Sequence, residues 1–384
     1  MINEIIGVMP DEASIISPKK SENSHFNEFR FKTSKFIHYI KRRMKALEGF
    51  LDEKPNTKPV PCLHCDYCNY QSHCKNFWRD NQSIFEISGA TKNQVSRLEN
   101  VGITNLQELS NRQTINVKIN KDTLDKLKIK AKLRLDRMNG GKPKFAVLNN
   151  SETGLEEFLP EENQHDIYFD IEGDPIIEGG LEYLFGYVLG RGKFSKFEAF
   201  WAHNKDQEKK AVEKIIKLFL DHCTYNPDAH IYHYNSYEIN ALRNLSQKYG
   251  VYEEELDILL RAEKFVDLYK FVQKSLITSE KGVSLKDLEI FFSGKRSDEV
   301  TDAASSVIMY ERWREANDQQ ILDDIATYNE QDCRSIPLMR TWLEETVFKN
   351  KIIHRISKLI SVEDQKIETS DLQSNEEELM AHSI

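Results

Sequence analysis

The segment "HDIYFDIEGDP" at residues 165–175 constrains the fold more than any other part of the chain. Its β-branched and aromatic residues predict a buried strand at 166–171. Asp170 and Glu172 lie two residues apart, so their side chains point to the same face of that strand. Neighbouring carboxylates repel each other unless a cation lies between them. The segment predicts either a solvated acidic pair at a strand end or a cation site.

From residue 165 onward, strands and helices alternate along the chain. Three neighbouring strands, then a helix and another strand, predict an α/β fold with a mixed sheet and helices on its faces. Asp267 is expected to end a further strand and to cap the helix after it. Strands are predicted at 166–171, 183–189, 194–200 and 230–234, and helices at 206–221, 236–249, 268–276, 284–292, 304–315 and 318–345.

Two later segments supply acidic side chains that could join Asp170 and Glu172. In "IYHYNSYEINALRNL" a strand runs into a helix with Glu238 in its first turn. In "LDDIATYNEQDCRSIPLM" Tyr328 and Asp332 are four residues apart and share one helix face. Carboxylates from three elements suit two-metal hydrolysis of phosphodiesters, and hard oxygen ligands select Mg²⁺ or Mn²⁺. The tyrosine would orient the attacking water or help to take its proton.

The order of these motifs resembles the DEDD exonucleases of the ribonuclease-H-like fold, in the variant that has a tyrosine. Further segments extend the resemblance to the RecB-like nuclease family that carries a YprB-type ribonuclease-H-like domain. The similarity is dense over residues 160–345 and looser over 62–135. The segments are "GLEYLFGYV", "FWAHN", "DAHIYHYNSYE", "FVDLYKF", "SLKDLE", "YERWRE" and "YNEQDCRS".

This resemblance implies a metal-dependent 3′–5′ exonuclease that acts on nucleic acid, with single-stranded DNA expected over RNA. The implied ligands of two Mg²⁺ or Mn²⁺ ions are Asp170, Glu172, Glu238 and Asp332, and Tyr328 is the implied catalytic tyrosine. Glu238 departs from the family pattern, whose second motif usually supplies aspartate. The alternative is a non-catalytic nucleic-acid-binding subunit that works with a helicase or a separate nuclease.

Four of the six cysteines form a cluster with the spacing C-x2-C-x2-C-x5-C. Cys62, Cys65, Cys68 and Cys74 are therefore expected to bind metal. Zinc favours thiolate pairs on separate loops, whereas this spacing is closer to ferredoxin-type ligation. RecB-like nucleases hold an iron–sulfur cluster with a C-x2-C-x5-C tail and one upstream cysteine, so here Cys62 would be the fourth ligand. We expect a [4Fe–4S] cluster, with Zn²⁺ as the alternative.

The front of the chain is basic and the back is acidic, although the net charge is −9. Residues 1–150 hold 26 basic against 16 acidic residues, and residues 151–384 hold 27 against 46. A basic half is a candidate phosphate-binding surface. Residues 84–138 resemble helix-hairpin-helix modules, with two helices joined at Gly102-Ile103. Linker helices are the alternative to nucleic-acid contacts by Lys126, Lys128, Lys130, Lys132 and Arg134.

These patterns predict five regions and a cytoplasmic protein. No apolar run approaches the length of a membrane span, and the acidic start lacks the features of a signal peptide. Residues 1–60 lack the aspartate and Glu-x-Lys of RecB-like nucleases, so we expect a remnant of that domain. The regions are the remnant at 1–60, the cysteine site at 61–80, a helical region at 81–145, the ribonuclease-H-like domain at 160–347, and a helical end with an acidic disordered tail at 348–384.

Overall fold

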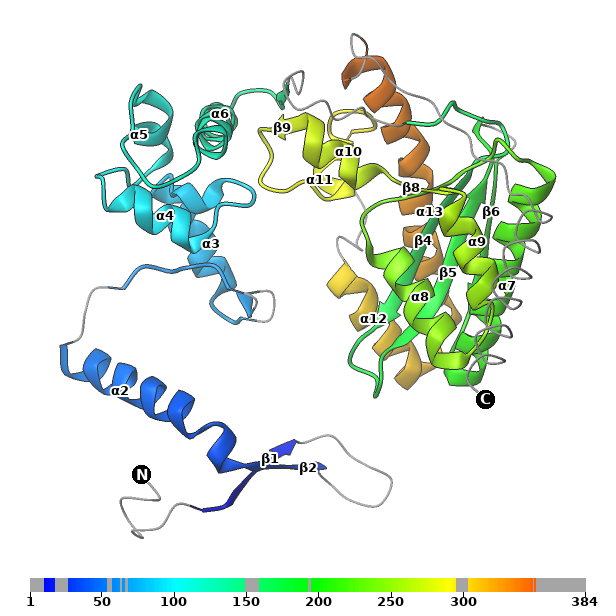
Figure 1. Ribbon diagram of the computed structural model, residues 1–384, viewed down its shortest axis with the longest axis horizontal. Helices are drawn as coiled ribbons and strands as arrows, with labels where there is room; N and C mark the ends of the chain where they lie inside the picture. Colours follow the sequence, from blue (N-terminus) through cyan, green and yellow to red (C-terminus); the bar gives the residue numbers. More distant parts are fainter. Residues whose placement is uncertain are drawn as a thin grey trace, which may run out of the picture. The chain divides into compact units, whose positions relative to one another are not determined.

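The chain divides into two compact units, Met1–Cys62 and Leu63–Ile384 (Figure 1). The structure is a computed structural model. The predicted tail lies outside the described residues except for residue 349. The described residues are 10–17, 27–53, 57–62, 64–65, 68–148, 159–192, 195–294, 303–347 and 349.

The first unit is a β-hairpin followed by a long helix. Strands β1 (Glu12–Ser17) and β2 (Asn27–Lys32) pair antiparallel, and a short 3₁₀ turn η1 (Thr33–Lys35) leads into α2 (Ile37–Glu53). None of the α2 residues is buried. The unit therefore presents its apolar stripe, which includes Tyr39 and Leu47, as exposed surface.

The second unit opens with a helical region that has its own small core. Its elements are α3 (Gln71–Asp80), η3 (Ile84–Glu86), α4 (Lys92–Glu99), α5 (Leu106–Asn111) and α6 (Lys121–Met138). Gly102 turns the chain between α4 and α5 with φ of +77°, a conformation that favours glycine. Leu98, Ile103, Leu106 and Leu109 are fully buried around this turn. The two helices predicted around Gly102-Ile103 are confirmed.

A five-stranded mixed sheet forms the centre of the second unit, as the alternation of strands and helices predicts. Its order is β6-β5-β4-β7-β8, with antiparallel pairs on one side of β4 and parallel pairs on the other. β4 is therefore a central strand, which explains its almost continuous burial. The strands are β4 (Ile167–Asp174), β5 (Leu181–Leu189), β6 (Lys196–Trp201), β7 (Ile231–His233) and β8 (Phe265–Asp267).

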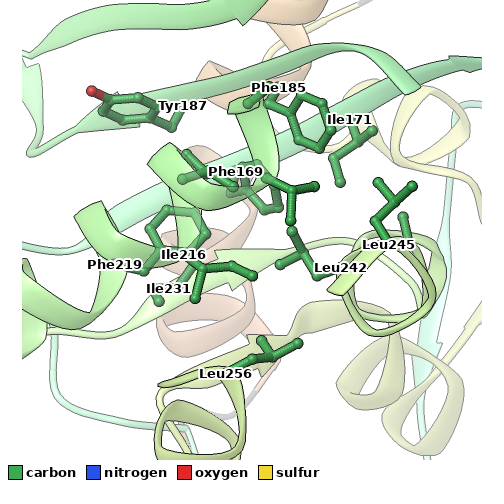
Figure 2. Packing of buried hydrophobic residues seen from close by; sticks show 14 of the residues in the cluster. Phe169, Ile171, Phe185, Tyr187, Ile216, Phe219, Ile231, Leu242, Leu245 and Leu256 are labelled. Atoms are coloured by element: carbon green, nitrogen blue, oxygen red, sulfur yellow. The ribbon is translucent and has the colours of Figure 1, made fainter. Parts of the chain in front are cut away.

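Helices cover both faces of the sheet. On one face, Phe169 and Ile171 pack with α7 (Lys205–Tyr225), α8 (Tyr237–Tyr249) and α9 (Glu253–Arg261) in the cluster drawn in Figure 2. On the other face, Tyr168 packs with α10 (Leu268–Ser275), α11 (Leu285–Glu289) and α13 (Gln319–Trp342). Because neighbouring residues alternate between faces, Asp170 and Glu172 share the face of α13.

Several elements differ from the sequence prediction. Helix α9 was not predicted, because it begins soon after Gly250 ends α8 and leaves little turn signal between them. The antiparallel pair of β3 (Phe145–Val147) with β9 (Leu276–Thr278) is too short to produce a recognisable period. The helix predicted at 318–345 ends at Trp342 and continues as a π-helical turn, η5 (Leu343–Val347). Helix α12 covers Ala303–Ala316.

Candidate active site

Three carboxylates from β4 and α13 meet on the α13 face of the sheet. Asp170, Glu172 and Asp332 each offer an oxygen, and these oxygens all lie within 4.8 Å of one another. Two unit charges about 5 Å apart repel by about 3 kcal/mol at an effective dielectric constant of about 20. Three such pairs would cost about as much as the whole stability of an ordinary domain. Protons or cations must therefore offset this charge, and the donor set fits a divalent metal ion.

The titration behaviour of these groups reflects the same crowding. Burial is the largest cause that raises the pKa of Glu172, to about 8, and the charge of Asp332 is the next. The pKa of Asp170 lies well above its usual range, because of burial and then the charges of Asp332, Glu172 and Glu238. Without a cation, the buried carboxylates therefore keep protons at a pH where exposed carboxylates are ionised.

Glu238 lies beside the three carboxylates but outside the group that meets the 4.8 Å distance. Helix α8 places it in its first turn, where it is buried and where burial raises its pKa. Its charge and hydrogen bonding contribute to the raised pKa of Asp170. On its other side, His233 Nδ1 lies 3.4 Å from Glu238 Oε2 and donates to Asn235 O at 2.7 Å. Glu238, which stands where the family pattern usually has aspartate, therefore lies next to the three carboxylates.

Tyr328 lies one helical turn before Asp332, as the sequence predicts, and Lys286 of α11 contacts it. Lys286 Nζ donates a hydrogen bond to Tyr328 Oη and lies 4.1 Å from the centre of the tyrosine ring. Burial, followed by the charge of Asp332, raises the pKa of Tyr328. The phenol is therefore neutral, and its oxygen lies between an ammonium group and the carboxylates.

Asn329 holds Asp170 in place from α13. Its Nδ2 donates to Asp170 Oδ2 at 2.7 Å. Gly186 of β5 pairs with Asp170, and a Cβ at Gly186 would lie 1.7 Å from Asn329 Oδ1. The absence of a side chain at Gly186 thus makes room for the amide that orients the carboxylate.

Ser306 and Tyr183 orient the second carboxylate. Ser306 Oγ donates to Glu172 Oε2 at 2.8 Å, and Tyr183 Oη is hydrogen-bonded to the same hydroxyl. All three side chains are buried. Helix α12 therefore contributes to the site through one hydroxyl group.

Sequence reasoning missed Lys286, Asn329 and Ser306. Asn329 lies three residues before Asp332 on the same helix, and a glycine inside a strand often marks a close backbone approach. These two signals together could have identified the Asn329–Gly186 contact. Lys286 and Ser306 reach the site only through the tertiary fold, and their local sequence carries no such signal.

Comparison with known proteins agrees with this geometry. A family model of the RNase H superfamily matches residues 167–344. This part of the chain is an RNase-H-like domain. No curated protein and no solved structure matches the chain. The family match and the acidic group together indicate a nucleic-acid-cleaving hydrolase.

Asp267 of the RNase-H-like domain has the structural role that the sequence predicts. It ends β8 and caps α10, because its Oδ1 accepts from Tyr269 N at 3.0 Å. The same oxygen accepts from Asn235 N at 2.9 Å, in the loop before α8. Asp267 thus ties the loop that leads to Glu238 to the edge of the sheet.

The basic residues predicted to bind nucleic acid occupy different environments on α6. Lys126 and Lys132 are exposed. Lys128 Nζ donates to Gln113 O at 3.0 Å, and Lys130 Nζ donates to Ser88 O at 2.8 Å. Arg134 pairs with Glu86 at 2.7 Å. Three of the five candidates therefore make internal contacts, which the alternation of lysines along the sequence does not reveal.

The backbone N–H groups of the hairpin at Gly102 already donate hydrogen bonds to acceptors within the chain. The N–H groups of Gly102 and Ile103 donate to carbonyls of α4, and Thr104 N donates to Glu108 Oε2 at 2.6 Å. A phosphate at this turn would have to displace these partners.

None of the four clustered cysteines forms a disulfide in the part of the chain that the structure describes. Cys62 is exposed, and Cys65, Cys68 and Cys74 are partly buried. Cys68 Sγ accepts a hydrogen bond from Tyr70 N at 3.4 Å, a contact that suits a thiolate. In the part of the chain that the structure describes, no three cysteine sulfurs meet the 4.8 Å distance, so metal binding would have to draw them together.

None of the described helices combines the length and apolar character needed to cross a membrane.

Proposed function

We propose that the RNase-H-like domain is a metal-dependent 3′–5′ exonuclease that prefers single-stranded DNA. The convergence of Asp170, Glu172 and Asp332 within 4.8 Å, next to Tyr328, carries this proposal. Glu238 would complete the ligand set for two Mg²⁺ or Mn²⁺ ions. When bound, the ions would supply charge stabilisation for the phosphodiester and a lowered pKa for water.

The chain's own residues would position the reactants. Tyr328 Oη, held by Lys286, would orient the attacking water by a hydrogen bond. The ammonium group of Lys286 would also attract the phosphate. Asn329 and Ser306 would keep one oxygen each of Asp170 and Glu172 occupied, so that the remaining carboxylate oxygens face the ions.

The test is cleavage of single strands labelled at either end. Purified protein with Mg²⁺ or Mn²⁺ should shorten 5′-labelled DNA stepwise and release the label of 3′-labelled DNA as a mononucleotide. Addition of EDTA should lower the rate of cleavage by about 100-fold or more, and so should Asp170→Asn or Asp332→Asn. Full activity in the Asp170→Asn/Asp332→Asn double variant would refute the site. Matched RNA strands test the preference for DNA.

The second candidate is a nucleic-acid-binding subunit without catalysis, in complex with a helicase or a separate nuclease. The position of Glu238 outside the close group favours it, because an incomplete ligand set would weaken the second ion site. Metal-independent strand binding with no cleavage under any metal would support this candidate over the exonuclease.

We also propose that Cys62, Cys65, Cys68 and Cys74 bind a [4Fe–4S] cluster, with Zn²⁺ as the alternative. The thiol donor set and the N–H contact to Cys68 support a metal of this kind. Such thiols stay reduced in the cytoplasm, where we expect the protein to act.

A further inference from the structure

A cavity of about 460 Å³ lies where the helical region meets the RNase-H-like domain. Its walls come from the loop at Ile87–Gly89 and from α6 on one side, and from α10 and β9 on the other. The volume falls in the range of small-molecule sites. None of the metal-site carboxylates lines it, so it is a separate site.

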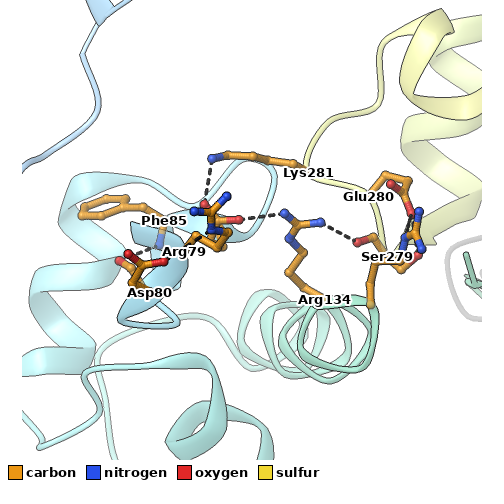
Figure 3. Close-up of polar contacts among 10 residues, drawn as sticks. Arg79, Asp80, Phe85, Arg134, Ser279, Glu280 and Lys281 are labelled. Carbon is orange, nitrogen blue, oxygen red and sulfur yellow. Dashed lines mark hydrogen bonds and ion pairs between the residues drawn. The ribbon is translucent and has the colours of Figure 1, made fainter. Parts of the chain in front are cut away.

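Contacts around Arg134 hold the two sides of this cavity together. Arg134 donates to Ser279 O at 3.4 Å and pairs with Glu86, which also pairs with Lys281 at 2.8 Å. Figure 3 shows Arg134 between the helical region and the connection that carries Ser279, with Lys281 reaching across from that connection. Arg137 also pairs with Glu280 across this boundary, at 3.0 Å. These contacts therefore join the two sides of the cavity.

Lys130 contributes a poorly neutralised cation to the cavity. Its Nζ donates to the neutral carbonyl of Ser88, and among the described residues it forms no ion pair. Burial, and then the charge of Lys126, lower its pKa. Gly89 has φ of +75°, and its missing side chain leaves the space over Lys130 Nζ open. An anion in the cavity would stabilise this ammonium group.

Arg134 adds a second cationic group, and one of its donors has no partner among the described residues. Its Nε is buried and donates no hydrogen bond to any described residue. The guanidinium group lines the cavity while its Nη2 remains paired with Glu86. Among the lining residues, the basic Lys130, Arg134 and Lys274 exceed the acidic Glu280. The local charge favours an anionic ligand.

The rest of the wall is apolar or amphipathic. Ile87, Val272, Leu276 and Val283 form an apolar surface, and Tyr269 accepts a hydrogen bond from Gln273 Nε2 at 2.6 Å. A phosphate ester with a flat, partly apolar group matches a cationic end next to such a wall.

We propose that this cavity binds a nucleotide, with its phosphate at Lys130 and Arg134 and its base against the apolar wall. The ligand is either a free mononucleotide or the end of a strand, since both present the same chemistry. This inference goes beyond the proposed cleavage activity and does not require it.

The test is calorimetric titration of the full-length protein with AMP in EDTA, which excludes metal-dependent binding at the carboxylates. We expect saturable binding, at least tenfold weaker binding of adenosine, and at least tenfold weaker binding of AMP by Lys130→Gln. Lys121→Gln is the matched control, because Lys121 is exposed on the same helix and does not line the cavity. Lys130→Arg keeps the charge and should retain binding, which separates lost recognition from lost folding.

The absence of saturable binding at millimolar AMP would overturn the proposal, as would equal binding by wild type and Lys130→Gln. Equal affinity for inorganic phosphate and AMP would overturn the nucleotide assignment. Displacement of AMP by a short 5′-phosphorylated strand would assign the site to strand ends, and no displacement would assign it to free nucleotides; both support a nucleotide site. Cleavage assays remain independent, so failure here leaves the exonuclease proposal intact.

Discussion

Asn329 Nδ2 donates a hydrogen bond to Asp170 Oδ2 at 2.7 Å, from a helix that can approach only because the facing strand has a glycine. Gly186→Ala should therefore displace Asn329 and release Asp170. We expect affinity for Mn²⁺ to fall by about 10–100-fold, as for other groups that orient metal ligands. Mn²⁺ titration followed by thermal unfolding measures this. Gly49→Ala, at a position with no atom within 4 Å of the new Cβ, is the control and should leave affinity unchanged.

Asp332→Asn should stabilise the metal-free protein and remove its response to metal. The amide relieves like-charge repulsion among the buried carboxylates. Wild type should gain thermal stability with Mn²⁺. The variant should have a higher melting temperature than wild type in EDTA, and Mn²⁺ should raise it little further. Equal metal-induced shifts in both proteins would show that the ion binds elsewhere.

The pH dependence of stability in EDTA should follow the raised pKa of Glu172. A folded pKa of about 8 means that the native state holds a proton that the unfolded state has lost above about pH 4.5. Stability should therefore fall as the pH rises from about 5 to 8. Mn²⁺ should flatten this trend, because the cation replaces the proton. Melting temperatures across this pH range, with and without Mn²⁺, provide the measurement.

Lys286→Gln should lower kcat more than it raises KM, because Lys286 fixes the hydroxyl of Tyr328. A misplaced group can cost about 100-fold in rate. Lys286→Arg should recover part of the loss. If Lys286 served substrate binding alone, KM would rise with kcat unchanged, and that result would contradict the positioning role.

Protein purified without oxygen should be brown and contain about four irons per chain, as a [4Fe–4S] cluster requires. Cys68→Ser should remove both the colour and the iron. A colourless protein with stoichiometric zinc would instead establish the alternative metal. Absence of both metals would refute a metal site at the cysteines.

Strand affinity should depend on Lys126 and Lys132, which are the two exposed lysines among the predicted nucleic-acid contacts of α6. Replacing Lys126 and Lys132 by Gln should weaken binding of single-stranded DNA and reduce the salt slope by about two. Turnover at saturating strand should change little, because the metal site lies elsewhere. A variant with wild-type affinity and salt slope would show that α6 is a linker helix.

The sequence predicts the centre of the fold better than its margins. β4 is identifiable because its apolar run is long, and Tyr328 and Asp332 because a helix period joins them. Glu238 is found as a helix-start carboxylate, but its distance from the other three depends on the loop tied by Asp267. The roles of Lys130 and Arg134 depend on segments distant in sequence, Ser88 and Ser279, which no local pattern connects to them.

The pairing of β3 with β9 has a consequence for where the chain can be truncated. The family match begins at residue 167, yet Phe145–Val147 supplies the hydrogen-bonding partner of Leu276–Thr278. A fragment that begins at residue 160 would leave β9 as an open edge next to the apolar side chains of α10. Open edges of this kind recruit other chains. The smallest fragment that does not aggregate should therefore begin before residue 145, and light scattering of nested N-terminal deletions would locate that boundary.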